Sequence, residues 1–185
     1  MRKKLMFLPV VLLTLCSSAF AQLEIDPPVS DGFNSPVGQA TSPYNPHKIT
    51  QRFQEPDPNV YTWRDPDGVV RPHPGHLGDD IGMPVGTPVK AASKGVVVYA
   101  KNAGSGWGNV IIVKHKLPNG EIWFTQYAHL SQIAVSVRSV VSRGQQIGKS
   151  GTLGTGPHLH FEVKKSAALG NFWPGPGYST SSSFV

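Results

Sequence analysis

The chain has 185 residues, a formal net charge of +6 at pH 7 and one cysteine, Cys16. A single cysteine excludes an internal disulfide and a zinc site built from several thiolates. The Lys and Arg residues form no stripe with interleaved aromatic side chains, so we expect no nucleic-acid partner.

The first 21 residues have the layout of a secretory signal peptide: a basic start at 2–4, an apolar run at 5–15 and a small-x-small site at 19–21. The run is too short for a transmembrane helix, which needs about 20 apolar residues. We therefore expect export to the periplasm or the medium of a bacterium, with no membrane anchor after cleavage. Loss of three basic residues then lowers the formal charge from +6 to +3. A competing interpretation is lipidation at Cys16, although Leu15 is larger than the residue that usually precedes such a cysteine.

Two segments of biased composition flank the part of the chain that can bury a core. Residues 22–46 predict an extended, poorly packed segment, and residues 166–185, rich in Gly, Pro and Ser, predict a flexible C-terminal tail. Residues 47–165 predict one domain. The extended segment has two interpretations, a lid that masks the active site or a spacer, and we favour the spacer. Its prolines are Pro27, Pro28, Pro36, Pro43 and Pro46.

The middle of the chain predicts β-strands at Val96–Ala100, Asn109–His115 and Ile122–Tyr127, which are short runs of β-branched and aromatic residues. Pro118-Asn119-Gly120 joins the last two, and Asn-Gly is a strong hairpin signal. No stretch of twelve residues has clean helical periodicity. We therefore expect a mostly β fold: a single domain with an antiparallel sheet or a sandwich-like core.

Strand alternation places the side chains of the last two strands. If the strand that contains Tyr127 continues to His129, these two residues share one face, opposite Gln126 and Ala128. Near the C-terminus, His158, His160 and Glu162 share a face, whereas Leu159 and Phe161 point toward apolar packing.

The histidines and one aspartate have spacings that suit a catalytic zinc site, which takes three protein ligands and leaves one position open. His76 and Asp80 are an even number of residues apart in a glycine-containing segment, so both can face the same way. His158 or His160 supplies the third ligand. The histidine left over, together with His129, can exchange protons or stabilise an oxyanion beside the metal.

Several polar and aromatic residues have two interpretations each. Asp79 competes with Asp80 for the metal, and we favour Asp80. Glu162 is either a hydrogen-bond partner of a metal ligand or an exposed strand residue. Trp107 either lines a groove or covers the core, and we favour core cover. His115 has no motif context and is predicted to lie at the surface.

Six motifs in the same order are similar to those of the lysostaphin/LytM-type zinc metallopeptidases, a family of peptidoglycan endopeptidases. The resemblance covers about residues 47–165. The motifs are His76 to Asp80, Gly86-Thr87-Pro88-Val89, Gly108-Asn109-Val110, Tyr127 to Ser131, Gly144 to Gly148 and Gly156 to Glu162.

The resemblance implies that His76, Asp80 and His160 bind one zinc ion per chain and that His129 and His158 are the catalytic histidines. It implies an antiparallel β fold with a groove over one sheet. It also implies hydrolysis of peptide bonds in the cross-links or stem peptides of peptidoglycan, and we expect a monomer.

Two alternatives remain open. One is a non-catalytic, peptidoglycan-binding module that activates other wall hydrolases. Such relatives typically lack ligands or catalytic histidines, whereas all five residues are present here. The other is a glycan-cleaving enzyme, which needs a pair of suitably spaced carboxylates, and acids are few near these motifs.

Overall fold

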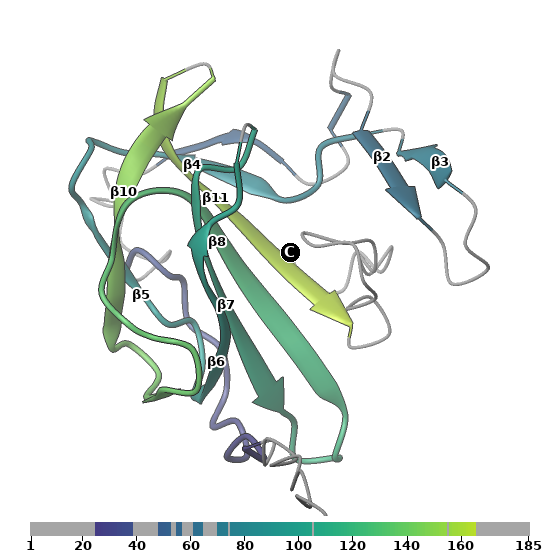
Figure 1. The fold of residues 1–185 in the computed structure, drawn as a ribbon, viewed down its shortest axis with the longest axis vertical. Helices are drawn as coiled ribbons and strands as arrows, with labels where there is room; N and C mark the ends of the chain where they lie inside the picture. The colour runs from purple at the N-terminus through teal and green to yellow at the C-terminus, as the bar shows by residue number, and fades with distance from the viewer. Residues whose placement is uncertain are drawn as a thin grey trace, which may run out of the picture.

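The computed structural model of the chain describes residues 25–38, 48–52, 55–56, 61–64, 70–73, 75–104, 106–154 and 156–165. The expected signal peptide and the expected C-terminal tail lie outside these residues. The described residues form eleven strands (Figure 1): β1 Lys48–Gln51, β2 Tyr61–Arg64, β3 Val70–His73, β4 Asp79–Gly82, β5 Pro88–Lys90, β6 Gly95–Asn102, β7 Asn109–Lys116, β8 Ile122–Ile133, β9 Val140–Val141, β10 Gln146–Leu153 and β11 Gly156–Lys165. Within the ranges described, no helix is long and apolar enough to cross a bilayer.

Nine of the strands form one antiparallel sheet, in the order β1-β4-β11-β10-β8-β7-β6-β9, with β5 paired to β10. β2 and β3 form a separate two-stranded ribbon. β11 pairs with β10 through its first residues and with β8 through the rest, so β4, β11 and β8 lie side by side (Figure 1). The prediction of a mostly antiparallel β fold is confirmed.

The three strands predicted from the middle of the chain correspond to β6, β7 and β8. The turn predicted between the last two is present: Gly120 has a φ of 86° and donates its backbone N–H to the carbonyl of Leu117 at 2.9 Å. Positive φ is the conformation for which glycine has no steric penalty. β8 is longer than predicted, because it continues past Tyr127 to Ile133.

Alternation along β7 buries apolar side chains on both faces of the sheet. Ile111 and Val113 belong to one core cluster, together with Tyr127. Val110 and Ile112 belong to a second cluster. Full burial of such a side chain contributes roughly 1.5–3 kcal/mol, so β7 is held in place from both sides.

Residues 25–38 are extended but do not match the expectation of poor packing. The hydroxyls of Ser30 and Ser93 form a buried hydrogen bond of 2.7 Å. The ring of Phe33 meets the ring of His115 edge-on, with centroids 5.2 Å apart. These contacts hold the segment against β7 and the chain before β6.

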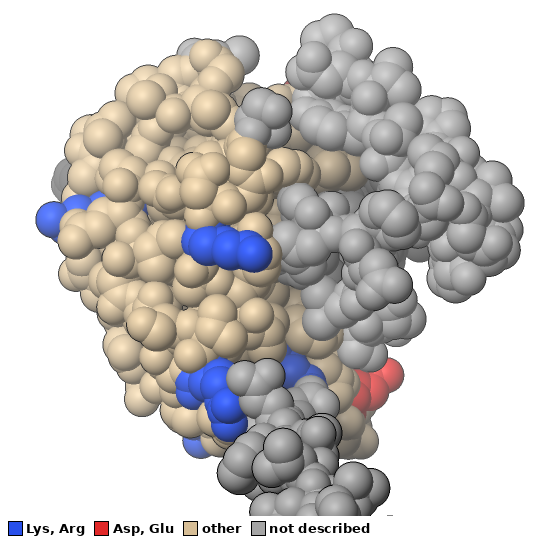
Figure 2. All heavy atoms as spheres, viewed as in Figure 1, with Lys and Arg blue, Asp and Glu red and all other residues tan. Residues whose placement is uncertain are grey.

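Charged side chains also link this segment to the domain. Lys116 pairs with Asp26 at 2.8 Å, and Arg143 pairs with Asp31 at 3.6 Å. Such exposed pairs contribute about 0–1 kcal/mol each. On the face drawn in Figure 2, the Lys and Arg side chains stand in separate groups rather than in one band.

His115 is buried, so its prediction as a surface residue is wrong. Its Nδ1 lies 2.8 Å from the carbonyl oxygen of Lys94, and its Nε2 lies 2.8 Å from the Thr125 hydroxyl. The Thr125 hydroxyl also lies 3.0 Å from the Tyr127 hydroxyl. Burial lowers the pKa of His115 to about 4, although the bond to Lys94 opposes the shift. The histidine is therefore a neutral part of the core at pH 7.

Candidate metal centre

Three neighbouring strands and one loop bring the predicted site residues together. Asp80 lies in β4 directly opposite His160 in β11, and side chains at opposed positions of an antiparallel pair lie on the same face. His76 lies in the loop that leads into β4. His129 comes from β8, and His158 precedes His160 on the same face of β11.

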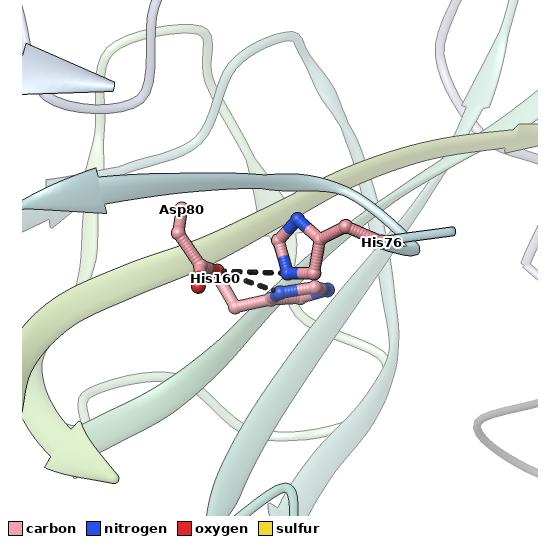
Figure 3. A group of neighbouring side chains, drawn as sticks. All are labelled: His76, Asp80 and His160. Carbon is pink, nitrogen blue, oxygen red and sulfur yellow. Dashed lines mark hydrogen bonds and ion pairs between the residues drawn. The ribbon is translucent and has the colours of Figure 1, made fainter. Parts of the chain in front are cut away.

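The carboxylate of Asp80 is the centre of the group. Its Oδ1 lies 3.3 Å from Nε2 of His76 and 2.9 Å from Nδ1 of His160, and both imidazoles point toward it (Figure 3). Its Oδ2 lies 3.4 Å from Nε2 of His158. His76, Asp80 and His160 are all buried, and each offers one ligand atom that lies within 4.8 Å of the other two.

The donor set fits zinc. A tetrahedral ion with bonds of about 2.0–2.2 Å holds its ligand atoms about 3.4 Å apart. The distances of 3.3 Å and 2.9 Å from Asp80 Oδ1 to the two imidazole nitrogens are close to this spacing. Two imidazoles and one carboxylate also leave a fourth position open.

Gly78 allows the loop to lie directly against β11. A Cβ at this position would be 2.3 Å from the carbonyl oxygen of Phe161, 2.6 Å from Cγ of Glu162 and 3.0 Å from Nε2 of His160. Any side chain would therefore push residues 76–80 away from the strand. The glycine in the first motif is needed for this close approach.

Glu162 supports His160 from the side opposite to Asp80. Its Oε1 lies 2.7 Å from Nε2 of His160, and Gln126 donates to the same oxygen at 2.9 Å. Glu162 is 2% exposed, so its interpretation as an exposed strand residue is wrong. A carboxylate that accepts the second N–H of a ligating histidine fixes the tautomer and the ring orientation.

The sequence analysis did not identify Gln126 as part of the site, because no motif in the neighbouring sequence points to such a role. Only the pairing of strands reveals it, since Gln126 in β8 lies opposite Glu162 in β11.

The charges at the centre stabilise one another. Burial disfavours the carboxylate of Asp80, but hydrogen bonds from His160 and His76 outweigh it and hold the pKa of Asp80 well below its usual range. Burial likewise disfavours a charged His160, yet its bonds to Asp80 and Glu162 raise its pKa to about 9. Because metal ligands must be deprotonated, a metal ion here would displace the proton that His160 shares with Asp80.

His129 sits in a β-bulge. β8 has two residues, Ala128 and His129, opposite the single residue of β7 that separates Asn109 from Ile111. His129 adopts a left-handed backbone with a φ of 58°, which is uncommon for a residue other than glycine. Bulges next to active sites typically re-aim a side chain.

The bulge moves His129 to the face opposite the one predicted. Tyr127 packs in the core, whereas the ring of His129 lies 4.7 Å from the ring of His158 and 5.5 Å from that of His160. The prediction that His129 and Tyr127 share a face is therefore wrong. Gln126, predicted on the other face, lies on the side of the centre, as its bond to Glu162 shows.

Backbone carbonyls fix the tautomers of His129 and His158. Nδ1 of His129 lies 3.2 Å from the carbonyl oxygen of Trp107, which also accepts the backbone N–H of His129 at 3.0 Å. Nδ1 of His158 lies 2.8 Å from the carbonyl oxygen of Gly156. Because a carbonyl only accepts, each Nδ1 carries a proton, so in the neutral form of either ring the lone pair is on Nε2. Burial, reinforced by the neighbouring His160 and His158, lowers the pKa of His129 to about 4.

Trp107 covers the core, as favoured from the sequence, and it also contacts the histidines of the centre. Its side chain packs against the second core cluster. Its ring also stacks on His129 with centroids 6.3 Å apart and meets His160 edge-on at 5.3 Å. It therefore forms an apolar wall beside the two histidines.

Comparison with known proteins identifies the family. The pattern that defines peptidase family M23 matches residues 74–171, more than half of the chain and a range that includes all five candidate site residues. The chain belongs to peptidase family M23. The resemblance to lysostaphin-type peptidases seen in the sequence is thereby confirmed.

Relatives within family M23 include enzymes of the bacterial cell wall. Peptidoglycan DD-endopeptidase ShyA of Vibrio cholerae is 47% identical over 90 residues, which are 48% of this chain and 20% of ShyA. The crystal structure of a zinc-containing peptidase from Vibrio cholerae has a TM-score of 0.55 and 32% identity, covering 74% of this chain and 37% of that one. Lysostaphin from Staphylococcus simulans has a TM-score of 0.53 and 34% identity, covering 65% and 44% of the two chains. The chain thus spans about a fifth of the length of ShyA.

Proposed function

We propose that this M23 chain is a zinc-dependent endopeptidase that hydrolyses peptide bonds in the cross-links or stem peptides of peptidoglycan. One observation carries the proposal: the buried carboxylate of Asp80 contacts His76 and His160, with two further histidines beside it. The family supports peptidase chemistry, and the name of the relative ShyA supports peptidoglycan as the substrate.

In this proposal, His76, Asp80 and His160 hold the zinc ion. The donor atoms are Nε2 of His76, Oδ1 of Asp80 and Nδ1 of His160, which face one another. Glu162 holds the ring of His160 so that Nδ1 points inward. When bound, zinc supplies a Lewis acid that polarises a carbonyl group and makes water a stronger nucleophile.

His129 and His158 form the proton-transfer pair. Their Nδ1–H groups are held by backbone carbonyls, so both Nε2 atoms can accept a proton from the attacking water. The ring that accepts the proton becomes an imidazolium, which can stabilise the oxyanion and then protonate the leaving amine. We assign these steps to the pair as a unit, because coupled groups titrate together.

The test incubates the purified protein with isolated peptidoglycan, with and without a chelator, and identifies the released fragments by mass spectrometry. We expect peptide-bond cleavage that the chelator stops and added zinc restores. His160→Ala should take up no zinc and release no fragments. A folded, zinc-loaded protein that cleaves nothing would contradict the proposal and would favour the regulatory module instead.

We also propose that residues 1–21 direct export to the cell envelope, on the strength of their basic, apolar and small-x-small sections. Cell fractionation and N-terminal sequencing of the recovered protein test this. A mature chain that begins at Gln22 is the expected result, and retention of Met1 on a cytoplasmic protein would contradict it.

A further inference from the structure

Each of the two carboxylate oxygens of Asp80 faces different histidines. Oδ1 contacts His76 and His160, whereas Oδ2 lies 3.4 Å from Nε2 of His158. A second set of potential ligands follows from this, because Asp80, His129 and His158 are all buried and each offers one ligand atom within 4.8 Å of the others.

The two histidines of this second set are prepared as ligands. The contacts of both Nδ1 atoms with backbone carbonyls, at 3.2 Å for His129 and 2.8 Å for His158, leave the lone pairs on Nε2. A ligating histidine usually donates its other N–H in this way. Such an arrangement serves proton transfer and metal binding equally well.

We propose that the chain holds a second divalent-cation site, formed by Asp80 Oδ2, His129 and His158, which zinc fills only after the first site. Asp80 would then serve both sites, with Oδ1 facing His76 and His160 and Oδ2 facing His158. Repulsion between the two cations and the sharing of one carboxylate make the second site the weaker one.

Filling the second site would inhibit hydrolysis. A cation on the Nε2 atoms of His129 and His158 takes the lone pairs that proton transfer requires. The expected inhibition rests on the proposed function, since it assumes that these two histidines move protons. Binding of a second metal ion does not, because it is measured without any substrate.

The test is equilibrium dialysis against zinc from nanomolar to submillimolar free concentration, with bound metal counted by mass spectrometry. Visible absorbance during titration with Co²⁺ provides a second readout. We expect two equivalents of different affinity in the unaltered protein, and cleavage of peptidoglycan that falls as the second equivalent binds. His129→Asn, chosen because Asn tolerates a left-handed backbone, and His158→Ala should each keep the first equivalent and lose the second.

A double variant, His47→Ala with His73→Ala, is the control for binding by histidines outside both sets, and it should still take up two equivalents. Uptake of a single equivalent by the unaltered protein would overturn the inference and leave the proposed function intact. A second equivalent that survives in His129→Asn, or that disappears in the control, would also overturn it. Absence of any tightly bound zinc would instead remove the proposed function, and the second site with it.

Discussion

The support of His160 by Glu162 gives a prediction whose size can be worked out. The two side chains are 4% and 0% exposed, and Oε1 lies 2.7 Å from Nε2. A hydrogen bond to a charged group contributes about 1.5–3 kcal/mol, against about 0.5–1.5 kcal/mol for a neutral pair. Glu162→Gln keeps the shape and an acceptor oxygen but removes the charge, so we expect zinc binding to lose the difference between the two ranges, about 1–1.5 kcal/mol. This raises the Kd for zinc by about fivefold to thirteenfold.

Competition between the protein and a chromophoric chelator of known affinity measures this Kd at pH 7.5. Glu121→Gln is the matched control, because Glu121 is an exposed acid directly before β8 and its substitution changes the net charge equally. Urea unfolding shows whether each variant keeps its fold. A Kd within twofold of the original in folded Glu162→Gln would refute the reasoning, as would an equal loss of affinity in the control.

Three further predictions follow from the described contacts. Gly78→Ala should lower zinc affinity more than tenfold, because its Cβ would meet the Phe161 carbonyl at 2.3 Å; metal content after dialysis measures this, and normal uptake would contradict it. His129→Ala should keep the first zinc and lose at least about a hundredfold in kcat; normal fragment release would remove His129 from the mechanism. The pKa of His115 is about 4 in the folded protein against an ordinary 6.5. The unfolded chain therefore binds a proton at higher pH than the folded protein does, and the free energy of unfolding falls as the pH drops from 6.5 toward 4. From pH 7.5 to 4.5 the unaltered protein should lose about 2–3 kcal/mol more unfolding free energy than His115→Gln; parallel losses in urea unfolding would count against the assignment.

Sequence periodicity located the parts of the centre that lie on regular strands. His158, His160 and Glu162 share a face of β11 because the strand alternates without interruption there, and Leu159 lies in the core as predicted. The even spacing of His76 and Asp80 also indicated two side chains that lie together, 3.3 Å apart. The close approach that Gly78 permits emerges only when β11 lies beside the loop.

The residues that sequence reasoning placed wrongly depend on partners far along the chain. His115 is buried because Lys94, Thr125 and Phe33 surround it, and these contacts come from three separate segments. His129 departs from alternation because of an extra residue in β8, which the sequence pattern does not reveal. In both cases tertiary pairing overrides a local rule.

The bulge at His129 also limits how this centre could be transferred to another protein. A regular antiparallel sheet presents residues on a face only at every second position. On such a sheet His129 would point into the core beside Tyr127, whatever the identities of its neighbours. Removal of one residue from the bulge would also shift the part of β8 that pairs with β10. A designer who grafts these side chains would therefore have to copy the irregular backbone as well, and the same requirement explains why an insertion or deletion here should damage chemistry and folding together.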